Sequence, residues 1–156
     1  MTDTETICTF TLDGLFLGLN VGDVHEVLLA QSLTAVPLAH PVVAGLINIR
    51  GQIVSAVDLR RVLHLPPRSS ESDPPVNVVV RNGNELVSFQ VDLVGDVLEL
   101  DSKGLTPPPE TTSAETKHLF RGAYQRPEQL LLVIDTSRAM EAIVAQARSK
   151  LARHLN

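Results

Sequence analysis

The stretch that decides the fold is residues 44–60, AGLINIRGQIVSAVDLR. Apolar residues dominate it on both sides of one arginine–glycine pair, Arg50-Gly51, which is typical of two buried strands joined by a tight turn. Glycine supplies the permissive backbone that such a turn needs, and we predict the turn at Gly51-Gln52. Arg50 is therefore expected at a strand end, where its guanidinium leaves an apolar surface and can meet a carboxylate.

The flanking segments continue the β pattern. Apolar runs separated by turn residues predict further strands near residues 7–12, 15–19, 76–80, 86–91, 94–100, 118–124 and 130–134. Residues 24–29 are expected to form a short irregular or strand segment. Two proline-rich polar connections interrupt them, at residues 66–75 and 106–115. From Thr136 the period changes to three or four residues, which predicts an amphipathic helix that packs through Met140, Ile143, Ala147 and Leu151.

One four-residue segment occurs twice. Residues 21–24 and 94–97 are both VGDV, and each follows a hairpin signal, Asp13-Gly14 in the first case and Asn82-Gly83 in the second. The repetition favours two related β subdomains, with coincidence as the alternative.

These segments resemble the CheW-like domains of bacterial chemosensory systems. The family pattern is GLINLRG, two or three residues, and then VPVIDLR, which residues 45–60 nearly reproduce. Residues 24–27, 91–98, 120–122 and 131–135 follow in the family's order. The resemblance implies a mainly β fold: one CheW-like domain over residues 7–144, made of two interleaved five-stranded SH3-like β-barrel subdomains packed together. A C-terminal α-helix over residues 136–155 and a flexible N-terminus over residues 1–6 complete the expected organisation.

The resemblance also implies a function, that of a non-enzymatic adaptor coupling methyl-accepting chemoreceptors to a CheA-type histidine kinase. The expected partners are the regulatory domain of the kinase and the cytoplasmic tip of the receptor, with no cofactor, no nucleic acid and no direct membrane insertion. One alternative is the same coupling role in a gliding, twitching or developmental pathway. Another is a small β-barrel enzyme that uses a carboxylate pair, for which a raised pKa in a cleft would be the sign.

The expected partner-binding residues are Val24, Glu26, Gly45, Arg50, Gly51 and Val97. By resemblance, Glu26 and Arg50 match positions that contact the receptor and the kinase. An ion pair between these two at the subdomain surface is the alternative, and the two interpretations are not exclusive.

The other four members of this set have structural alternatives. Under the family geometry, Val24 and Val97 line an apolar groove shared by the subdomains; the alternative is plain core packing. Gly45 and Gly51 act through the backbone shape that they allow. Ser88 stands where the family commonly has glycine, and we expect its side chain to fill a surface that the family leaves open for a partner.

Composition excludes several classes of function. Eighteen acidic and thirteen basic residues leave a net charge of -5, which disfavours non-specific nucleic-acid binding. The five histidines are scattered, Cys8 is the single cysteine, and neither a phosphate loop, a dinucleotide fingerprint nor a nucleophile elbow occurs. The acidic N-terminus is not a secretory signal, and no apolar run approaches the roughly 18 residues of a membrane span, so a cytoplasmic location is expected.

Overall fold

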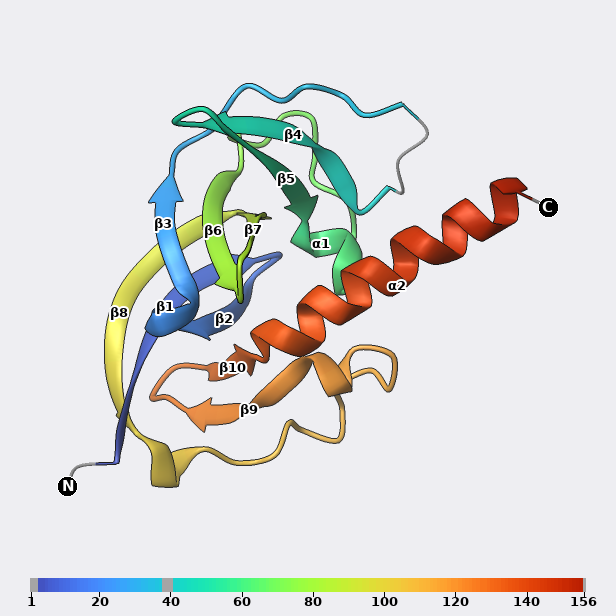
Figure 1. The fold of residues 1–156 in the computed structure, drawn as a ribbon. Helices are drawn as coiled ribbons and strands as arrows, with labels where there is room; N and C mark the ends of the chain where they lie inside the picture. Colours follow the sequence, from blue (N-terminus) through green and yellow to red (C-terminus); the bar gives the residue numbers. More distant parts are fainter. Residues whose placement is uncertain (1–2, 38–40, 156) are drawn as a thin grey trace.

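The computed structural model describes residues 3–37 and 41–155, with side chains described as far as residue 146. Ten strands form two five-stranded sheets (Figure 1). Sheet A has the order β8-β1-β2-β10-β9, with bounds Leu93–Asp101, Thr4–Leu12, Leu15–Asn20, Leu130–Ile134 and Phe120–Gln125. Sheet B has the order β3-β6-β7-β5-β4, with bounds Val24–Leu28, Val76–Asn82, Glu85–Val91, Gln52–Asp58 and Val43–Ile49. The mainly β prediction with two five-stranded subdomains is confirmed.

The two halves of the chain exchange strands between the sheets. Each half begins with a hairpin in one sheet, β1-β2 or β6-β7, and sends its next three strands to the other sheet. The third strand of each half, β3 or β8, pairs antiparallel with the first strand of the other half's hairpin. The last strand of each half, β5 or β10, pairs parallel with the second hairpin strand. The halves of the chain, and not the two sheets, are therefore the corresponding units.

Both copies of the VGDV segment come shortly after the hairpin of their half. Its conformation differs between the two copies. Residues Val21–Asp23 form a short 3-10 helix, η1, that precedes β3, whereas Val94 to Val97 lie inside β8. The repeat thus marks a common topology but does not impose a common local structure.

Each sheet curls until its edges nearly meet, although neither is a closed ring of strands. In sheet B, Thr34 exchanges two 2.8 Å backbone hydrogen bonds with Leu46 of β4. In sheet A, Thr106 bonds in the same way to Ala123 of β9, at 2.9 and 2.8 Å. Thr34 follows β3 and Thr106 follows β8, so each bridge links the continuation of one edge strand to the opposite edge. This near-closure accords with the SH3-like barrel expected from the sequence.

Three apolar clusters correspond to this arrangement. The largest lies between the sheets and contains Phe10, Leu17 and Phe89, all fully buried. One smaller cluster lies within the curl of each sheet. The cluster in sheet A surrounds Ile7, Leu131 and Val133, and the cluster in sheet B surrounds Ile47, Val54 and Val79. Strands buried on both faces explain why their sequences are nearly continuous apolar runs.

One helix follows the last strand of each half. The Asp58 carboxylate accepts the Arg60 N–H and begins α1, Leu59–Val62. The Asp135 carboxylate accepts the Arg138 N–H, at 3.0 Å, and begins α2, Thr136–Leu155. These are side-chain caps of the kind that start helices. The predicted C-terminal helix is therefore confirmed.

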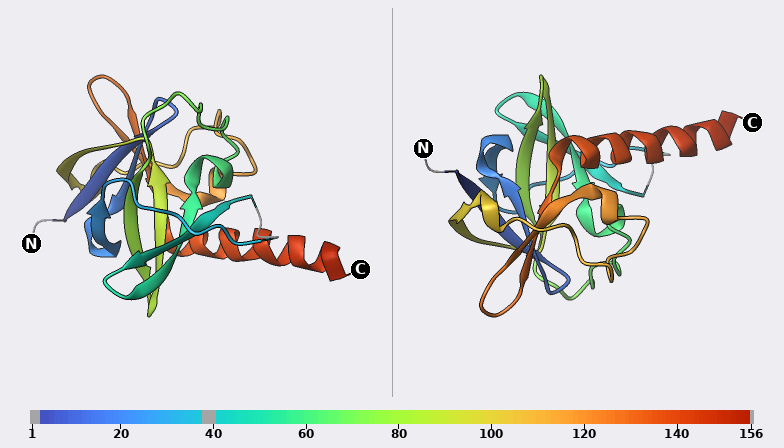
Figure 2. Two further views of the ribbon diagram at one scale, coloured as in Figure 1. Left: turned by 90° about the horizontal axis from the view of Figure 1, so that it is seen from above. Right: turned by 90° about the horizontal axis from the view of Figure 1, so that it is seen from below.

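The first turns of α2 hold the helix on the body of the protein. Ala139, Met140 and Ile143 are buried in the cluster between the sheets, and the helix then continues beyond the sheets (Figures 1 and 2). Met140 and Ile143 thus pack as predicted, while the side chains of Ala147 and Leu151 lie outside the described residues.

Two boundaries differ from the sequence expectation. The expected flexible segment 1–6 overlaps β1, which begins at Thr4, and Met1 and Thr2 lie outside the described residues. The strand expected at residues 118–124 begins only at Phe120, after a 3-10 turn, η3, over Lys117–Leu119.

Candidate functional site

Glu26 and Arg50 form a two-point ion pair on the surface of sheet B. Arg50 Nη1 donates to Glu26 Oε1 at 2.7 Å, and Nη2 donates to Oε2 at 3.0 Å. Glu26 lies on β3 and Arg50 in the β4–β5 turn, so the pair joins the two opposite edges of the sheet. The Arg50 side chain is 75% exposed and that of Glu26 only 17%. The intramolecular pair that the sequence offered as one alternative is therefore present, with its guanidinium open to solvent.

The turn that carries Arg50 has an unusual backbone. Ile49 pairs with Gln52, so Arg50 and Gly51 are the two turn residues, and their φ angles are 50° and 88°. The turn predicted at Gly51-Gln52 was wrong by one residue. A positive φ costs a residue with a Cβ roughly 1–2 kcal/mol, and such strain is concentrated at functional sites. An arginine at this position points to a use for its side chain.

Further charged groups extend the pair along β3 and β6. Arg81 Nη2 lies 3.0 Å from His25 Nδ1, and because a guanidinium only donates, Nδ1 is the acceptor. His25 Nε2 lies 3.8 Å from Glu26 Oε1. Two apolar side chains of sheet B are also exposed, Val27 of β3 by 42% and Ile53 of β5 by 60%. The surface therefore combines polar groups of both signs with exposed apolar area.

Gly45 occupies a close backbone approach in β4. A Cβ placed on it would lie 2.8 Å from the Thr34 carbonyl oxygen, at the bridge that nearly closes sheet B. Gly122 of β9 is in the same situation in sheet A, where a Cβ would lie 2.6 Å from the Thr106 oxygen. Gly45 thus has a structural role. Because the two halves exchange equivalent strands, Gly122 has the same role in the other sheet.

Three other expectations concern single positions. Val24 begins β3 and is partly buried against the cluster between the sheets. Val97 lies on β8 of the other sheet and is 57% exposed. Ser88 is fully buried, and its hydroxyl donates to Asn77 Oδ1 at 3.0 Å. The expectation that Ser88 fills an open surface is therefore wrong, since its oxygen is satisfied inside the protein.

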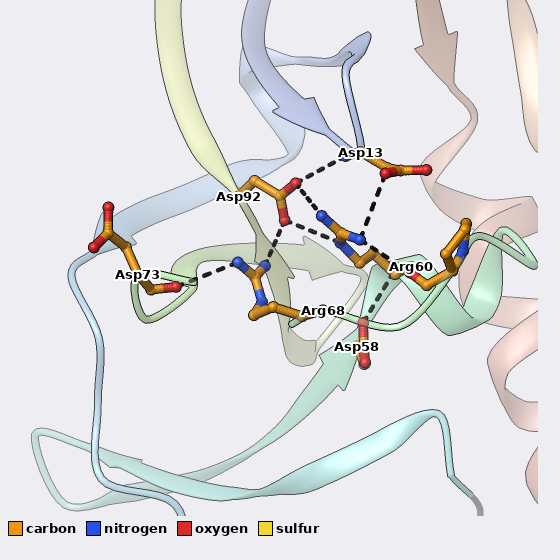
Figure 3. Close-up of polar contacts among 7 residues, drawn as sticks. Asp13, Asp58, Arg60, Arg68, Asp73 and Asp92 are labelled. Carbon is orange, nitrogen blue, oxygen red and sulfur yellow. Dashed lines mark hydrogen bonds and ion pairs between the residues drawn. The ribbon is translucent and has the colours of Figure 1, made fainter. Parts of the chain in front are cut away.

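A second polar cluster is centred on Asp92, whose partners were not identified from the sequence (Figure 3). Asp92 follows β7 and accepts hydrogen bonds from Arg60 Nη2 at 2.7 Å, Arg68 Nη2 at 2.6 Å and the Asp13 N–H at 2.8 Å. Arg60 comes from α1, Arg68 from the proline-rich connection and Asp13 from the β1–β2 turn. One carboxylate thus ties together elements of both sheets.

The charge interactions in this cluster have a structural role and not a catalytic one. Burial alone would raise the pKa of Asp92, but the hydrogen bonds from Arg60 and the Asp13 N–H and the charges of both arginines lower the pKa below its ordinary value. The hydrogen bond to Asp92 also raises the pKa of Arg60. An acid catalyst needs the opposite shift in a carboxyl pKa. Asp92 is thus suited to hold cations in place, as a carboxylate at a strand end often does.

The described residues, 3–37 and 41–155, contain neither a candidate metal cluster nor a candidate membrane-spanning helix. Among these residues, no three His, Cys, Asp or Glu side chains gather closely enough to hold a metal ion. The same part of the chain contains no helix that is both long and apolar enough to cross a bilayer.

Comparison with known proteins gives a consistent result. The CheW-like domain family matches residues 6–144. Chemotaxis protein CheW of Bacillus subtilis is 24% identical over 143 residues, covering 92% of this chain and 91% of the relative. Chemotaxis protein CheW of Klebsiella aerogenes is 27% identical over 133 residues, covering 85% and 80%. The crystal structure of scaffolding protein TtCheW from Thermoanaerobacter tengcongensis superposes with a TM-score of 0.76 at 27% identity, over 86% of this chain and 90% of that one.

Proposed function

Since the chain belongs to the CheW-like domain family over residues 6–144, we propose that it is a chemosensory adaptor that couples methyl-accepting chemoreceptors to a CheA-type histidine kinase. The family match carries this proposal, because it spans the two sheets and the first turns of α2. Full-length relatives named chemotaxis protein CheW and a solved relative described as a scaffolding protein support it. A cytoplasmic location and the lack of enzymatic activity belong to the same proposal.

The surface around Glu26 and Arg50 is the proposed recognition site. A guanidinium has five N–H donors, and Glu26 takes two of those of Arg50. The remaining donors can bind a partner carboxylate while the intramolecular pair stays intact. Exposed apolar side chains such as Val27 and Ile53 would supply affinity, and the charges would orient the partner.

Such an adaptor acts by holding its partners in a defined geometry. Binding energy that differs between two states of the kinase shifts the population of those states, and no bond is made or broken by the adaptor itself. The receptor tip and the kinase regulatory domain need separate surfaces, which two sheets in one domain can provide. The relatives' names favour chemotaxis over a gliding, twitching or developmental pathway with the same coupling chemistry.

Reconstitution with the kinase and receptor encoded alongside the chain tests this function. We expect the protein to alter kinase autophosphorylation only when receptor is present, and to lose this effect in Arg50→Glu. Arg126→Glu is the matched control, because Arg126 borders the β9–β10 turn that corresponds to the β4–β5 turn in the other half. Saturable nucleotide binding by the protein, with no effect on the kinase, would contradict the adaptor function.

A further inference from the structure

A pocket lies at one end of sheet A, away from the Glu26–Arg50 surface. It is formed by the start of β2, the start of β10, residues 63–65 after α1, and residues 109–116 of the long connection before β9. Its volume is about 640 Å³, within the range of roughly 300–1,000 Å³ that is usual for small-molecule sites. None of the proposed partner-binding residues lines it.

The floor of the pocket is apolar and held in place by the core. Leu63 and Phe120 line it and belong to the buried cluster between the sheets, against which Leu65 and Leu132 also pack. Side chains fixed by core packing cannot collapse readily into the space. The pocket is therefore largely formed before any ligand arrives, as small-molecule sites usually are.

The mouth of the pocket is polar and carries one carboxylate. Glu115 supplies a carboxylate, and His64 Nε2 lies 3.8 Å from its Oε2. The hydroxyls of Thr111 and Thr112 and the amide of Gln129 also line the mouth, whereas no lysine or arginine does. A turn holds the backbone of Glu115, because its N–H donates to the Ser113 hydroxyl and the N–H groups of Thr116 and Lys117 both donate to the Ser113 carbonyl.

We propose that this pocket binds a small organic amine, with an apolar body on the Leu63–Phe120 floor and a protonated nitrogen at Glu115. The carboxylate at the mouth favours a cation and disfavours an anion of the same shape. This site goes beyond the proposed coupling function, and it neither requires nor excludes an adaptor role. It would give the protein a second input, a soluble ligand, on a face distinct from the charged surface of sheet B.

Fluorescence titration of the full chain tests the site with two probes that share one fluorophore. Dansylcadaverine carries the dansyl ring and a primary ammonium, and N-dansyl-6-aminohexanoic acid carries the same ring and a carboxylate. We expect saturable binding of one amine per chain, about tenfold tighter than the acid, as one nearby opposite charge can produce. Equal affinity for both probes, or binding that does not saturate, would overturn the proposal.

Point variants test whether the two probes bind in this pocket. Glu115→Gln should reduce the preference for the amine to about threefold or less, while Glu110→Gln, the same change in the same connection outside the pocket lining, should leave it intact. Gln129→Trp and Thr111→Trp each place a bulky ring on an exposed residue of the mouth and should weaken both probes. Two such variants are used so that a folding defect in one leaves the other informative. Unchanged binding in either folded variant would show that the probe sits elsewhere.

Discussion

Arg50 and Glu26 clasp the two edge strands of sheet B from the outside, with hydrogen bonds of 2.7 and 3.0 Å. Sheet A also has a polar contact between two of its strands, but this contact is of a different kind. There, Glu5 of β1 contacts Arg121 and Tyr124 of β9, and its side chain is only 8% exposed. The Arg121 side chain is 36% exposed and that of Arg50 is 75% exposed, so the ion pair of sheet B presents more of its arginine to solvent. This difference favours the sheet B pair as the proposed recognition site.

Exchanging the two charges separates the structural role of this pair from recognition. Arg50→Glu or Glu26→Arg alone should lower the free energy of unfolding by only about 1 kcal/mol, since exposed ion pairs contribute roughly 0.2–1 kcal/mol. The double variant restores the pair with its direction reversed. We expect it to regain the denaturation midpoint but not the affinity for kinase or receptor, because the partner then meets inverted charges. Normal binding of kinase and receptor by the double variant would show that the pair stabilises sheet B and has no part in recognition.

The acid limb of the stability curve should depend on Asp92. Its folded-state pKa is lowered, so its contribution is present above the ordinary carboxyl pKa of about 4 and is lost as the pH falls through the folded value. Asp92→Asn should lower the free energy of unfolding by about 2 kcal/mol at pH 7, as loss of hydrogen bonds to charged groups does, and should flatten the decline below pH 4. Urea denaturation between pH 2 and 7 measures both effects.

The control for this experiment is Asp96→Asn. Asp96 lies exposed on β8, four residues from Asp92, so its replacement should change stability by less than about 0.5 kcal/mol. An acid limb that is identical in wild type and Asp92→Asn would show that the cluster does not stabilise the fold.

Alanine at Gly45 or Gly122 should destabilise the protein by about 1–3 kcal/mol, the usual cost of overpacking. The new Cβ would meet a backbone oxygen at 2.8 or 2.6 Å, and a backbone bridge cannot move aside cheaply. Gly104→Ala is the matched control, because its Cβ would meet the Tyr124 ring at an ordinary 3.5 Å. Thermal denaturation compares the three, and equal melting temperatures would contradict the closure argument.

The first turns of α2 should contribute measurably to stability. Met140→Ala removes a side chain that is 5% exposed and should cost about 2–3 kcal/mol through the cavity that it leaves. Val144→Ala, one turn later and 42% exposed, should cost less than about 0.5 kcal/mol. Similar midpoints for both variants in guanidinium chloride would mean that the helix is not held by its buried face.

Much of the fold could be predicted from local patterns because strands, turns and caps depend on neighbouring residues. The apolar runs located the strands, and the change of period at Thr136 located the C-terminal helix, which the Asp135 carboxylate caps. The turn at Arg50 was placed one residue late because an arginine rarely adopts a positive φ. In this case a local rule was overridden by the register of β4 and β5, in which Ile49 pairs with Gln52.

The candidate site was predictable only in part. Glu26 and Arg50 came from the family resemblance, and the structure brings them together. The Asp92 cluster was not predictable, because Asp92 meets Arg68, Arg60 and Asp13 across 24, 32 and 79 residues of chain. Nothing in the local sequence distinguishes a serine on a strand surface from Ser88, whose burial and bond to Asn77 depend on the pairing of β6 with β7.

The sequence by itself determined the number and order of the strands, the C-terminal helix and the family to which the chain belongs, since each is set by side-chain periodicity or a contiguous motif. Only the tertiary structure decided which sheet each strand joins. Backbone hydrogen bonds between strands are the same whatever the side chains, so the exchange of β3 and β8 between the halves is chosen by how three apolar clusters pack together. The same curling brings the edges of sheet B within reach of one ion pair, and leaves the Arg50 side chain 75% exposed.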